Sequence, residues 1–261
     1  MNRGIDISRY QNGLKIVDAK RSGYNFVIMR GGFTGYGAKR PMRKDICFDD
    51  FYEQCKAAGM PCGVYYYSCA TNEQEGIDEA NFFYETCLKG KKFEYPIYID
   101  VENDYWQAAD KKGVTDAVIG FCQTLEKLGY FAGVYASLDW FNNKLESKRL
   151  NAFTKWVACW SDKKPDFKYN AFDMWQNSDC GVIGKMLVDT DLSFKDFPTI
   201  IKALGKNGYR KPATPKQKSI DEIAREVIQG KWGVGAERKT KLTAAGYDYK
   251  AVQSKVNELS K

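Results

Sequence analysis

Histidine is absent from this chain of 261 residues. Its absence excludes serine–histidine and cysteine–histidine catalysis and removes the commonest metal ligand. No run reaches the roughly 20 apolar residues that a membrane span requires. The first residues, Met1–Asp6, lead into strand-like sequence without an apolar signal segment. We therefore expect a protein made in the cytoplasm and not inserted in a membrane, whose chemistry uses carboxylates, Lys, Tyr or Cys and needs no metal or cofactor.

Paired cysteine motifs are also missing. Eight cysteines are spread along the chain, yet no two of them show C-x-x-C or another metal-ligand spacing. We expect all eight to be reduced and most to be buried as small apolar side chains. The net charge of +7 is uneven, because residues 202–261 carry 14 Lys and Arg against 6 Asp and Glu, whereas residues 1–201 carry 26 against 27. The basic end of the chain is therefore the part expected to seek a partner.

The sequence around Asp100 organises the rest of the chain. Residues 95–104 read Tyr-Pro-Ile-Tyr-Ile-Asp-Val-Glu-Asn-Asp, an apolar run of strand length in which Asp100 and Glu102 are two residues apart. Side chains alternate along a strand, so both carboxylates point to one face with Cβ atoms roughly 7 Å apart. Pro96 favours the start of a strand, which places the acids at its carboxyl end, the reactive end of parallel α/β folds. The alternative is a polar strand end that faces solvent.

The remaining strand-like segments predict an α/β barrel. The segment Gly129–Tyr135 repeats the pattern of Gly59–Tyr65 seventy positions earlier, and a repeated unit of helix, glycine and strand is what a βα barrel produces. The first five strands alternate with helices. The eight expected strands lie at residues 4–8, 26–30, 63–67, 95–102, 129–135, 156–160, 172–176 and 186–191. Helices are expected at residues 48–58, 72–88 and 115–128, and the glycines after the second strand are expected in a loop.

The end of the chain predicts a second, smaller domain. Residues 206–218 are polar, basic and interrupted by two prolines, so we expect a linker between a domain of residues 1–205 and a domain of residues 219–261. Ser219 and Glu222 form a capping box, and apolar residues then recur at helical spacing in three segments separated by glycines. We expect a small three-helix domain, near the lower size limit for independent folding.

Closure of the barrel predicts where the acids meet. The first and last strands of a closed barrel lie side by side, so Asp6 would lie beside Asp189 or Asp191. Asp100 and Glu102 would lie at the same mouth. Crowding and burial would raise the pKa of at least one of these carboxyl groups, as a general acid requires near neutral pH. A single aspartate at a strand end is more often a turn residue, but the combination indicates a catalytic site.

Aromatic and polar side chains near the strand ends form a second candidate set. Flat rings can stack against sugar faces, although packing in the core is an open alternative for each ring. Gln176 could hydrogen-bond an acetamido group or a hydroxyl. The predicted substrate-binding residues are Arg30, Tyr65, Tyr67, Tyr135, Trp160, Trp175, Gln176 and Asp191.

Four segments within about residues 2–200 resemble, in the right order, the motifs of glycoside hydrolase family 25, the lysozymes that cut peptidoglycan as N-acetylmuramidases. These segments are Gly4-Ile-Asp-Ile-Ser8, Tyr98-Ile-Asp-Val-Glu102, Trp175-Gln176 and Val188-Asp-Thr-Asp-Leu192. The resemblance implies an irregular TIM-like barrel of five βα units plus three β-strands. It implies Glu102 as the acid/base and Asp100 as the partner that orients the substrate acetamido group. It also implies Asp6 and Asp189 as supporting acids, although Asp191 fits the late aspartate under a two-residue shift.

The three-helix segment resembles a single CW-seven (Cpl-seven type) cell-wall-binding repeat, a module often found in several copies on phage endolysins. The resemblance rests on residues 224–235 and 242–249. Trp232, Tyr247 and Tyr249 are its candidate wall-binding residues, and the basic charge of the tail is another possible source of attraction to an anionic wall. A chain without a signal peptide fits an endolysin that a holin releases to the wall, and a bacterial autolysin with unconventional release would look the same.

The resemblance implies hydrolysis of the β-1,4 bond between N-acetylmuramic acid and N-acetylglucosamine. The substrate's own acetamido group would attack the anomeric carbon, which gives net retention and is a recognised exception to the two-carboxylate scheme. The expected partner is bacterial peptidoglycan, with no nucleic acid and no membrane. A chitinase-like glycosidase and a catalytically silent wall-binding protein remain as alternatives.

Overall fold

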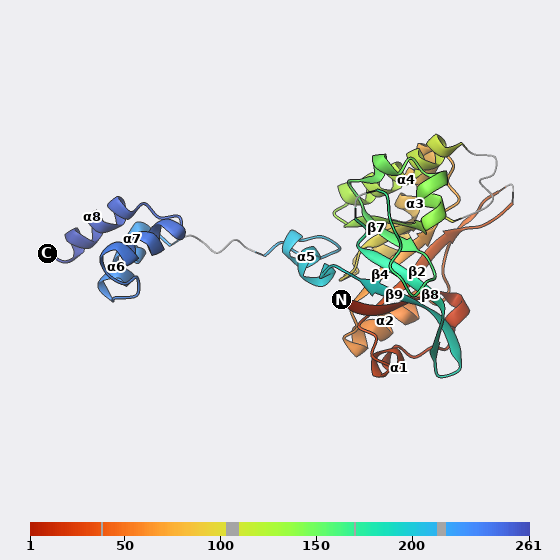
Figure 1. Cartoon of the computed structure of the whole chain (residues 1–261), viewed down its shortest axis with the longest axis horizontal. Coiled ribbons are helices and arrows are strands. Elements are labelled where there is room, and N and C mark those ends of the chain that lie inside the picture. The colour runs from red at the N-terminus through yellow and green to blue at the C-terminus, as the bar shows by residue number, and fades with distance from the viewer. Residues whose placement is uncertain (38, 103–109, 170, 213–217) are drawn as a thin grey trace. The chain divides into compact units, whose positions relative to one another are not determined.

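The computed structural model describes residues 1–37, 39–102, 110–169, 171–212 and 218–261 (Figure 1). The chain divides into two compact units, Met1–Pro212 and Ala213–Lys261. Within the described residues, no helix is both long enough and apolar enough to cross a bilayer. Residues 213–217 of the predicted linker lie outside the described part of the chain.

Eight strands of the first unit close into a barrel. Its strands are β1 (Asn2–Ile7), β2 (Phe26–Thr34), β4 (Cys62–Tyr67), β5 (Ile97–Asp100), β6 (Ala132–Ser137), β7 (Thr154–Ala158), β8 (Met174–Ile183) and β9 (Met186–Ser193). Neighbouring strands are parallel from β1 through β2 to β8, and β9 closes the barrel by pairing antiparallel with both β8 and β1. The predicted irregular barrel is therefore confirmed, including the closure between the first and last strands.

Helices cover the outside of the barrel. They are α1 (Ile16–Arg21), α2 (Phe48–Ala58), α3 (Glu73–Phe83) and α4 (Lys111–Lys127), and β6 is followed by two shorter helical turns at Trp140–Lys144 and Ser147–Leu150. Figure 1 shows α3 and α4 side by side on one flank of the sheet. The two helices approach so closely that a Cβ atom on Gly76 would lie 2.1 Å from the carbonyl oxygen of Ala117, so this position requires glycine. The segments that follow the strands are left to build the mouth.

The second strand is longer than predicted, because Gly31 and Gly32 lie within β2 and not in a loop. A Cβ atom on Gly31 would lie 2.4 Å from the ring of Phe83, and one on Gly32 would lie 2.9 Å from the carbonyl oxygen of Arg43. Close approach of neighbouring groups therefore requires glycine here, and not a turn. The short strand β3 (Met42–Lys44), which we did not predict, pairs with this extension outside the barrel.

Aromatic side chains fill the barrel interior below the mouth. Trp156 packs against Tyr98 and Tyr135, with ring centroids 5.2 and 4.4 Å apart, and Phe26 stacks on Tyr95 at 4.2 Å. A larger apolar cluster lies between the strands and the helices. Six of the eight cysteines are buried, as predicted, whereas Cys159 is partly exposed and Cys180 is exposed. A filled interior means that ligands can enter only at the ends of the strands.

The predicted linker begins too early, because Asn207 belongs to the barrel. Asn207 is fully buried, its amide donates to the carbonyl oxygen of Tyr95, and its Oδ1 accepts from the backbone N–H of Phe131. Both partners precede strands, so Asn207 closes the end of the barrel opposite the strand carboxyl ends. The helix before it, α5 (Phe197–Leu204), packs the ring of Phe197 against the rings of Tyr95 and Phe131. Polar composition suggested a linker, but these hydrogen bonds satisfy the polar groups inside the fold.

The second unit contains the three predicted helices, α6 (Ile220–Ile228), α7 (Gly235–Ala244) and α8 (Tyr249–Leu259). The capping box is present, since the hydroxyl of Ser219 accepts from the backbone N–H of Glu222 and the Glu222 carboxylate accepts from the backbone N–H of Ser219. The small core consists of Ile223, Ala224, Val227, Leu242, Val252 and Val256.

Candidate active site

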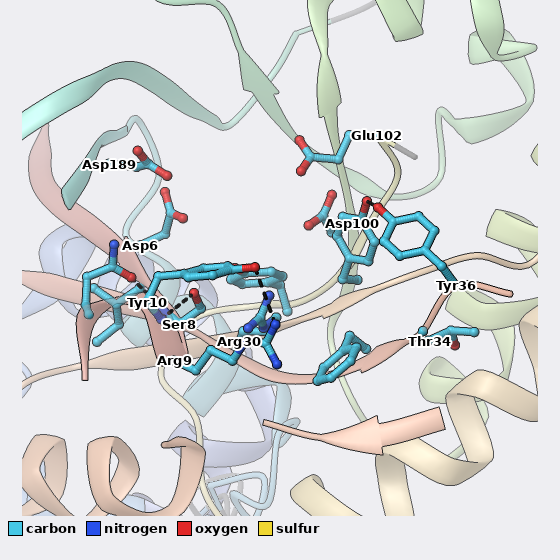
Figure 2. Close-up of a pocket in the computed structure, with 16 residues that line it drawn as sticks. Asp6, Ser8, Arg9, Tyr10, Arg30, Thr34, Tyr36, Asp100, Glu102 and Asp189 are labelled. Carbon is cyan, nitrogen blue, oxygen red and sulfur yellow. Dashed lines mark hydrogen bonds between the residues drawn. The ribbon is translucent and has the colours of Figure 1, made fainter. Parts of the chain in front are cut away.

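The carboxyl ends of the strands open onto a polar cavity of about 420 Å³. Asp6 reaches it from β1, Asp189 from β9, and Asp100 from the last position of β5, while Glu102 follows two residues later. Figure 2 shows these four carboxylates grouped on one side of the cavity. The structure thus brings together the four acids that the sequence predicts as catalytic.

Burial keeps these acids from all being ionised together. It raises the pKa of Asp100 well above its usual range, the charge of Glu102 raises it further, and the cation of Arg30 opposes both. Burial, followed by the charges of Asp191 and Asp189, likewise raises the pKa of Asp6. Because close carboxylates repel one another, a charge on Glu102 disfavours ionisation of Asp100, whereas a proton on Glu102 favours it.

The register of the last strand separates Asp189 from Asp191. Asp189 pairs with Asp6 across the antiparallel ladder, whereas Asp191 pairs with Gly4, one layer deeper in the barrel. Burial and the charge of Asp179 raise the pKa of Asp189 to about 6. Asp191 is buried and accepts from the indole N–H of Trp156 at 2.8 Å. Asp189 therefore faces the cavity, while Asp191 supports the floor beneath it.

Gln176 connects three of the candidate residues. The indole N–H of Trp160 can only donate, so the Gln176 atom that faces it at 3.2 Å is the carbonyl Oε1. This fixes the amide and turns its Nε2 toward Asp6, at 2.8 Å from Oδ2. The hydroxyl of Tyr135 donates to the same Oε1 at 2.9 Å and lies 3.5 Å from Oε2 of Glu102. Gln176 thus orients its neighbours and is itself held on three sides.

Among the described residues, no three His, Cys, Asp or Glu side chains are arranged to hold a metal ion. The acids instead share the mouth with aromatic rings. Tyr65 and Tyr67 line the cavity, and the hydroxyl of Tyr67 is 2.7 Å from that of Tyr36. Carboxylates beside flat rings suit a site for carbohydrate chemistry.

Residues 5–186 match the family model of glycosyl hydrolases family 25. The chain belongs to this family. A lysozyme of Streptococcus phage Cp-7 is 29% identical over 209 residues, which are 76% of this chain and 56% of that protein, so the chain spans little more than half the length of the curated relative it matches. Residues 221–259 match the CW_7 repeat.

Solved structures share the fold of this family-25 chain. The CTP1L endolysin is 18% identical with a TM-score of 0.68, over 99% of this chain and 100% of that chain. A lysozyme from Streptomyces coelicolor is 21% identical with a TM-score of 0.66, over 80% of this chain and 98% of that chain. At these identities, the likeness supports the barrel of the family-25 fold.

Two predicted substrate-binding residues lie outside the lining of the cavity. Trp175 precedes Gln176 on β8, so its side chain points away from the barrel interior, where it is buried in the outer core and donates to the carbonyl oxygen of Cys159. Asp191 lies below the cavity and not among the residues that line it. Neither side chain lines the described cavity, and direct substrate binding by these two residues stays a prediction. Trp160 is also absent from the cavity lining but is 62% exposed beside the mouth.

The sequence prediction missed residues on the opposite wall of the family-25 cavity. Arg9 and Tyr10 follow the first strand, and Phe33 and Tyr36 come from the end of β2 and the segment after it. Their positions within a few residues of the predicted strand ends, Ser8 and Arg30, were the available signal, since residues after a barrel strand line the mouth. Trp156, which lines the deeper part of the site, was recognised only as part of a strand.

The candidate wall-binding residues of the second unit are half buried. Trp232 packs edge-on against Tyr247 at 6.0 Å between ring centroids and donates to the carboxylate of Glu226 at 3.1 Å. The hydroxyl of Tyr247 accepts from the backbone N–H of Lys218. Together with Tyr249, these rings pack against the small helical core, so each has a structural role in addition to the predicted binding role.

Proposed function

We propose that the chain is a lysozyme that hydrolyses the β-1,4 bond between N-acetylmuramic acid and N-acetylglucosamine in bacterial peptidoglycan. The observation that carries this proposal is the group of four carboxylates at the mouth of a family-25 barrel, with Glu102 exposed and Asp100 buried beside it. Glu102 would protonate the leaving oxygen, and the substrate acetamido oxygen would attack the anomeric carbon. Water would then open the cyclic intermediate, with Glu102 accepting its proton, so the anomeric configuration is retained.

Asp100 has an open hydrogen-bonding position suited to this mechanism. Its Oδ1 is buried and has no hydrogen-bond partner among the described residues. The acetamido N–H of a bound sugar would supply that partner, and an ionised Asp100 would make the acetamido oxygen a better nucleophile. Because Asp100 and Glu102 repel each other when both are charged, a proton on Glu102 favours this ionised form of Asp100. Asp6 and Asp189 would support the pair through their charges.

The hydrogen bonds around Gln176 favour a proton on Glu102. Tyr135 has one hydroxyl proton for two acceptors, Oε1 of Gln176 at 2.9 Å and Oε2 of Glu102 at 3.5 Å, and the shorter hydrogen bond is the one to Gln176. A hydrogen bond given to a carboxylate stabilises its charged form, so the shorter bond from Tyr135 to Gln176 leaves the charged form of Glu102 less stabilised. The hydrogen bonds that connect Trp160, Gln176 and Tyr135 therefore favour the protonated form of Glu102, which the general acid requires.

Trp160→Phe is expected to move the alkaline limb of the activity profile to lower pH, by about half to one pH unit. The ring is kept but the N–H is lost, so Gln176 can rotate and Tyr135 becomes free to donate to an ionised Glu102. The measurement is kcat/KM against pH on soluble glycan strands. An alkaline limb at the wild-type position would contradict the proposed effect of these hydrogen bonds on Glu102. Among the described residues that line the site, the other titratable or charged groups are Asp6, Arg9, Tyr10, Arg30, Tyr36, Tyr65, Tyr67, Asp100, Tyr135 and Asp189.

Product analysis tests the proposed reaction against its alternatives. A muramidase releases new reducing ends at N-acetylmuramic acid from peptidoglycan, whereas a chitinase-like enzyme would prefer chitin oligomers. A silent wall-binding protein would bind peptidoglycan and release no reducing ends. Cleavage of chitin at a comparable rate would contradict the proposed substrate, and binding without cleavage would contradict the proposed activity.

We further propose that the second unit holds the enzyme on the bacterial wall, where the enzyme acts after a holin releases it. Removing residues 213–261 is expected to leave the barrel folded and to change hydrolysis of soluble muropeptides little, because the shortened chain keeps Asn207 and its hydrogen bonds. Pelleting with walls and lysis of whole cells should fall, since tethering raises the effective concentration at the surface. Lysis as fast as that by the full chain would contradict the docking role.

A shorter truncation serves as the structural control. Ending the chain at Gly205 also removes Asn207, which leaves the groups it bonds in Tyr95 and Phe131 without this partner. This variant is expected to melt at a lower temperature than the one that ends at Pro212.

Binding of the full chain to walls in raised salt separates attraction by charge from specific contacts. Charge-driven binding weakens with salt, whereas binding through Trp232, Tyr247 and Tyr249 would persist.

A further inference from the structure

Two arginines face the carboxylates across the cavity (Figure 2). Arg9 comes from the turn after β1 and Arg30 from β2. The Cζ atom of Arg9 is 5.2 Å from the ring centroid of Tyr10 and 5.4 Å from that of Phe33. The Cζ atom of Arg30 is 5.4 and 5.2 Å from the same two centroids. Two cationic groups therefore share the same pair of rings, which hold them by cation–π contacts on one wall of the site.

Asp45 holds this wall together from behind. It is buried, and its Oδ2 accepts from Nε of Arg30 at 2.7 Å and from the backbone N–H of Arg9 at 3.2 Å. Its Oδ1 accepts from the backbone N–H of Cys47. The guanidinium of Arg9 instead donates to the hydroxyl of Tyr10 at 3.4 Å. One carboxylate thus fixes both arginines but forms an ion pair with Arg30 alone.

Arg30 also has an unused donor. Its side chain is nine-tenths buried, and Nη2 has no hydrogen-bond partner among the described residues. A buried donor without a partner is costly, and two neighbouring cations repel each other. An anion with two oxygens would relieve both costs, since guanidinium groups bind carboxylates through paired, charge-assisted hydrogen bonds.

We propose that Arg9 and Arg30 form a carboxylate subsite that receives the lactyl carboxylate of a muramoyl residue whose peptide stem has been removed. The proposal rests on the proposed function and deepens it. The glycan strand is otherwise uncharged, and its carboxylate would be repelled by Asp6, Asp100, Glu102 and Asp189. Among the described residues that line this cavity, only Arg9 and Arg30 offer it an opposite charge. The subsite would fix which way a strand lies in the cavity, and it would favour muramoyl-containing strands over chitin, which has no such group.

Three soluble substrates test the subsite. The first is a glycan strand freed of its peptides, with lactyl carboxylates exposed; the second is the same strand with those groups converted to methylamides; the third retains its peptide stems. The readout is the ratio of kcat/KM for the first substrate to that for the second. Arg9→Gln is expected to lower this ratio by roughly tenfold, since one charge-assisted contact is lost. Arg30→Lys keeps the charge but loses the fork, so a smaller fall is expected.

The control variant is Arg21→Gln, which removes one positive charge from an exposed residue outside this cavity. Each charged substrate, with or without peptide stems, is compared with the methylamide strand. Equal ratios of kcat/KM in Arg9→Gln and Arg21→Gln for both comparisons would overturn the subsite. A fall seen only with the peptide-bearing strand would support the subsite but assign it to a stem carboxylate. If none of the substrates were hydrolysed, the proposed function would be contradicted instead. Calorimetry would then test the subsite separately, through the ratio of the binding affinities for the first and second strands.

Discussion

Glu102→Gln is expected to lower turnover by about 10²- to 10⁴-fold, because glutamine keeps the size of the side chain but cannot deliver a proton. The loss should appear in kcat on soluble glycan strands, since the substrate contacts are retained. Glu102 is exposed at the mouth and lies outside the core, so the fold should be unaffected and the far-UV spectrum and melting temperature should match the wild type.

A matched control is Glu85→Gln, which makes the same chemical change at an exposed residue of the barrel surface that pairs with Lys89. This variant should retain full activity. More than a tenth of wild-type turnover in Glu102→Gln would remove Glu102 from the role of general acid.

Asp100→Asn is expected to lower kcat by about 100-fold or more, because the asparagine cannot carry the charge that would support the acetamido oxygen in the transition state. The same substitution should raise the stability of the fold at neutral pH. Burial raises the pKa of Asp100 in the folded chain, so the folded state binds more protons than the unfolded state, and stability falls as the pH rises above the unfolded value of about 3.9.

Asparagine does not titrate and avoids this cost. Asp100→Asn should therefore melt at a higher temperature than the wild type at pH 7, and the difference should vanish near pH 3. Thermal melts at the two pH values give the measurement. A lower melting temperature at pH 7 would mean that the loss of activity comes from damage to the fold, and near-normal activity would contradict the role of Asp100.

The acids could be predicted from the sequence because each depends on a local rule. Alternation predicts one face for Asp100, the last residue of β5, and Glu102, and both line the cavity; barrel closure brings β9 to β1. The choice between Asp189 and Asp191 needed the antiparallel register, which sequence spacing does not contain. Asp6 pairs with Asp189, and that pairing places one aspartate at the mouth and the other a layer below.

The aromatic residues were harder to predict because residue type does not report direction. Trp175 and Gln176 are neighbours on β8, so they point to opposite sides, and a Gln176 that reaches Asp6 requires Trp175 to face the outer core. The same alternation could have excluded Trp175 beforehand. Arg9 and Tyr10 were missed for a different reason, since they lie in a turn whose path depends on contacts with Asp45, a residue far along the chain.

Asn207 has a mechanical consequence for the proposed tethering of the barrel by the second unit. A pull on the residues after Pro212 is borne first by Tyr209, whose hydroxyl donates to Glu94, and then by the hydrogen bonds of Asn207 with Tyr95 and Phe131, at the amino ends of β5 and β6. The acids stand at the opposite ends of the strands. Under the proposed tethering, tension from the wall would strain this end of the barrel, and the four carboxylates at the opposite end would keep their spacing.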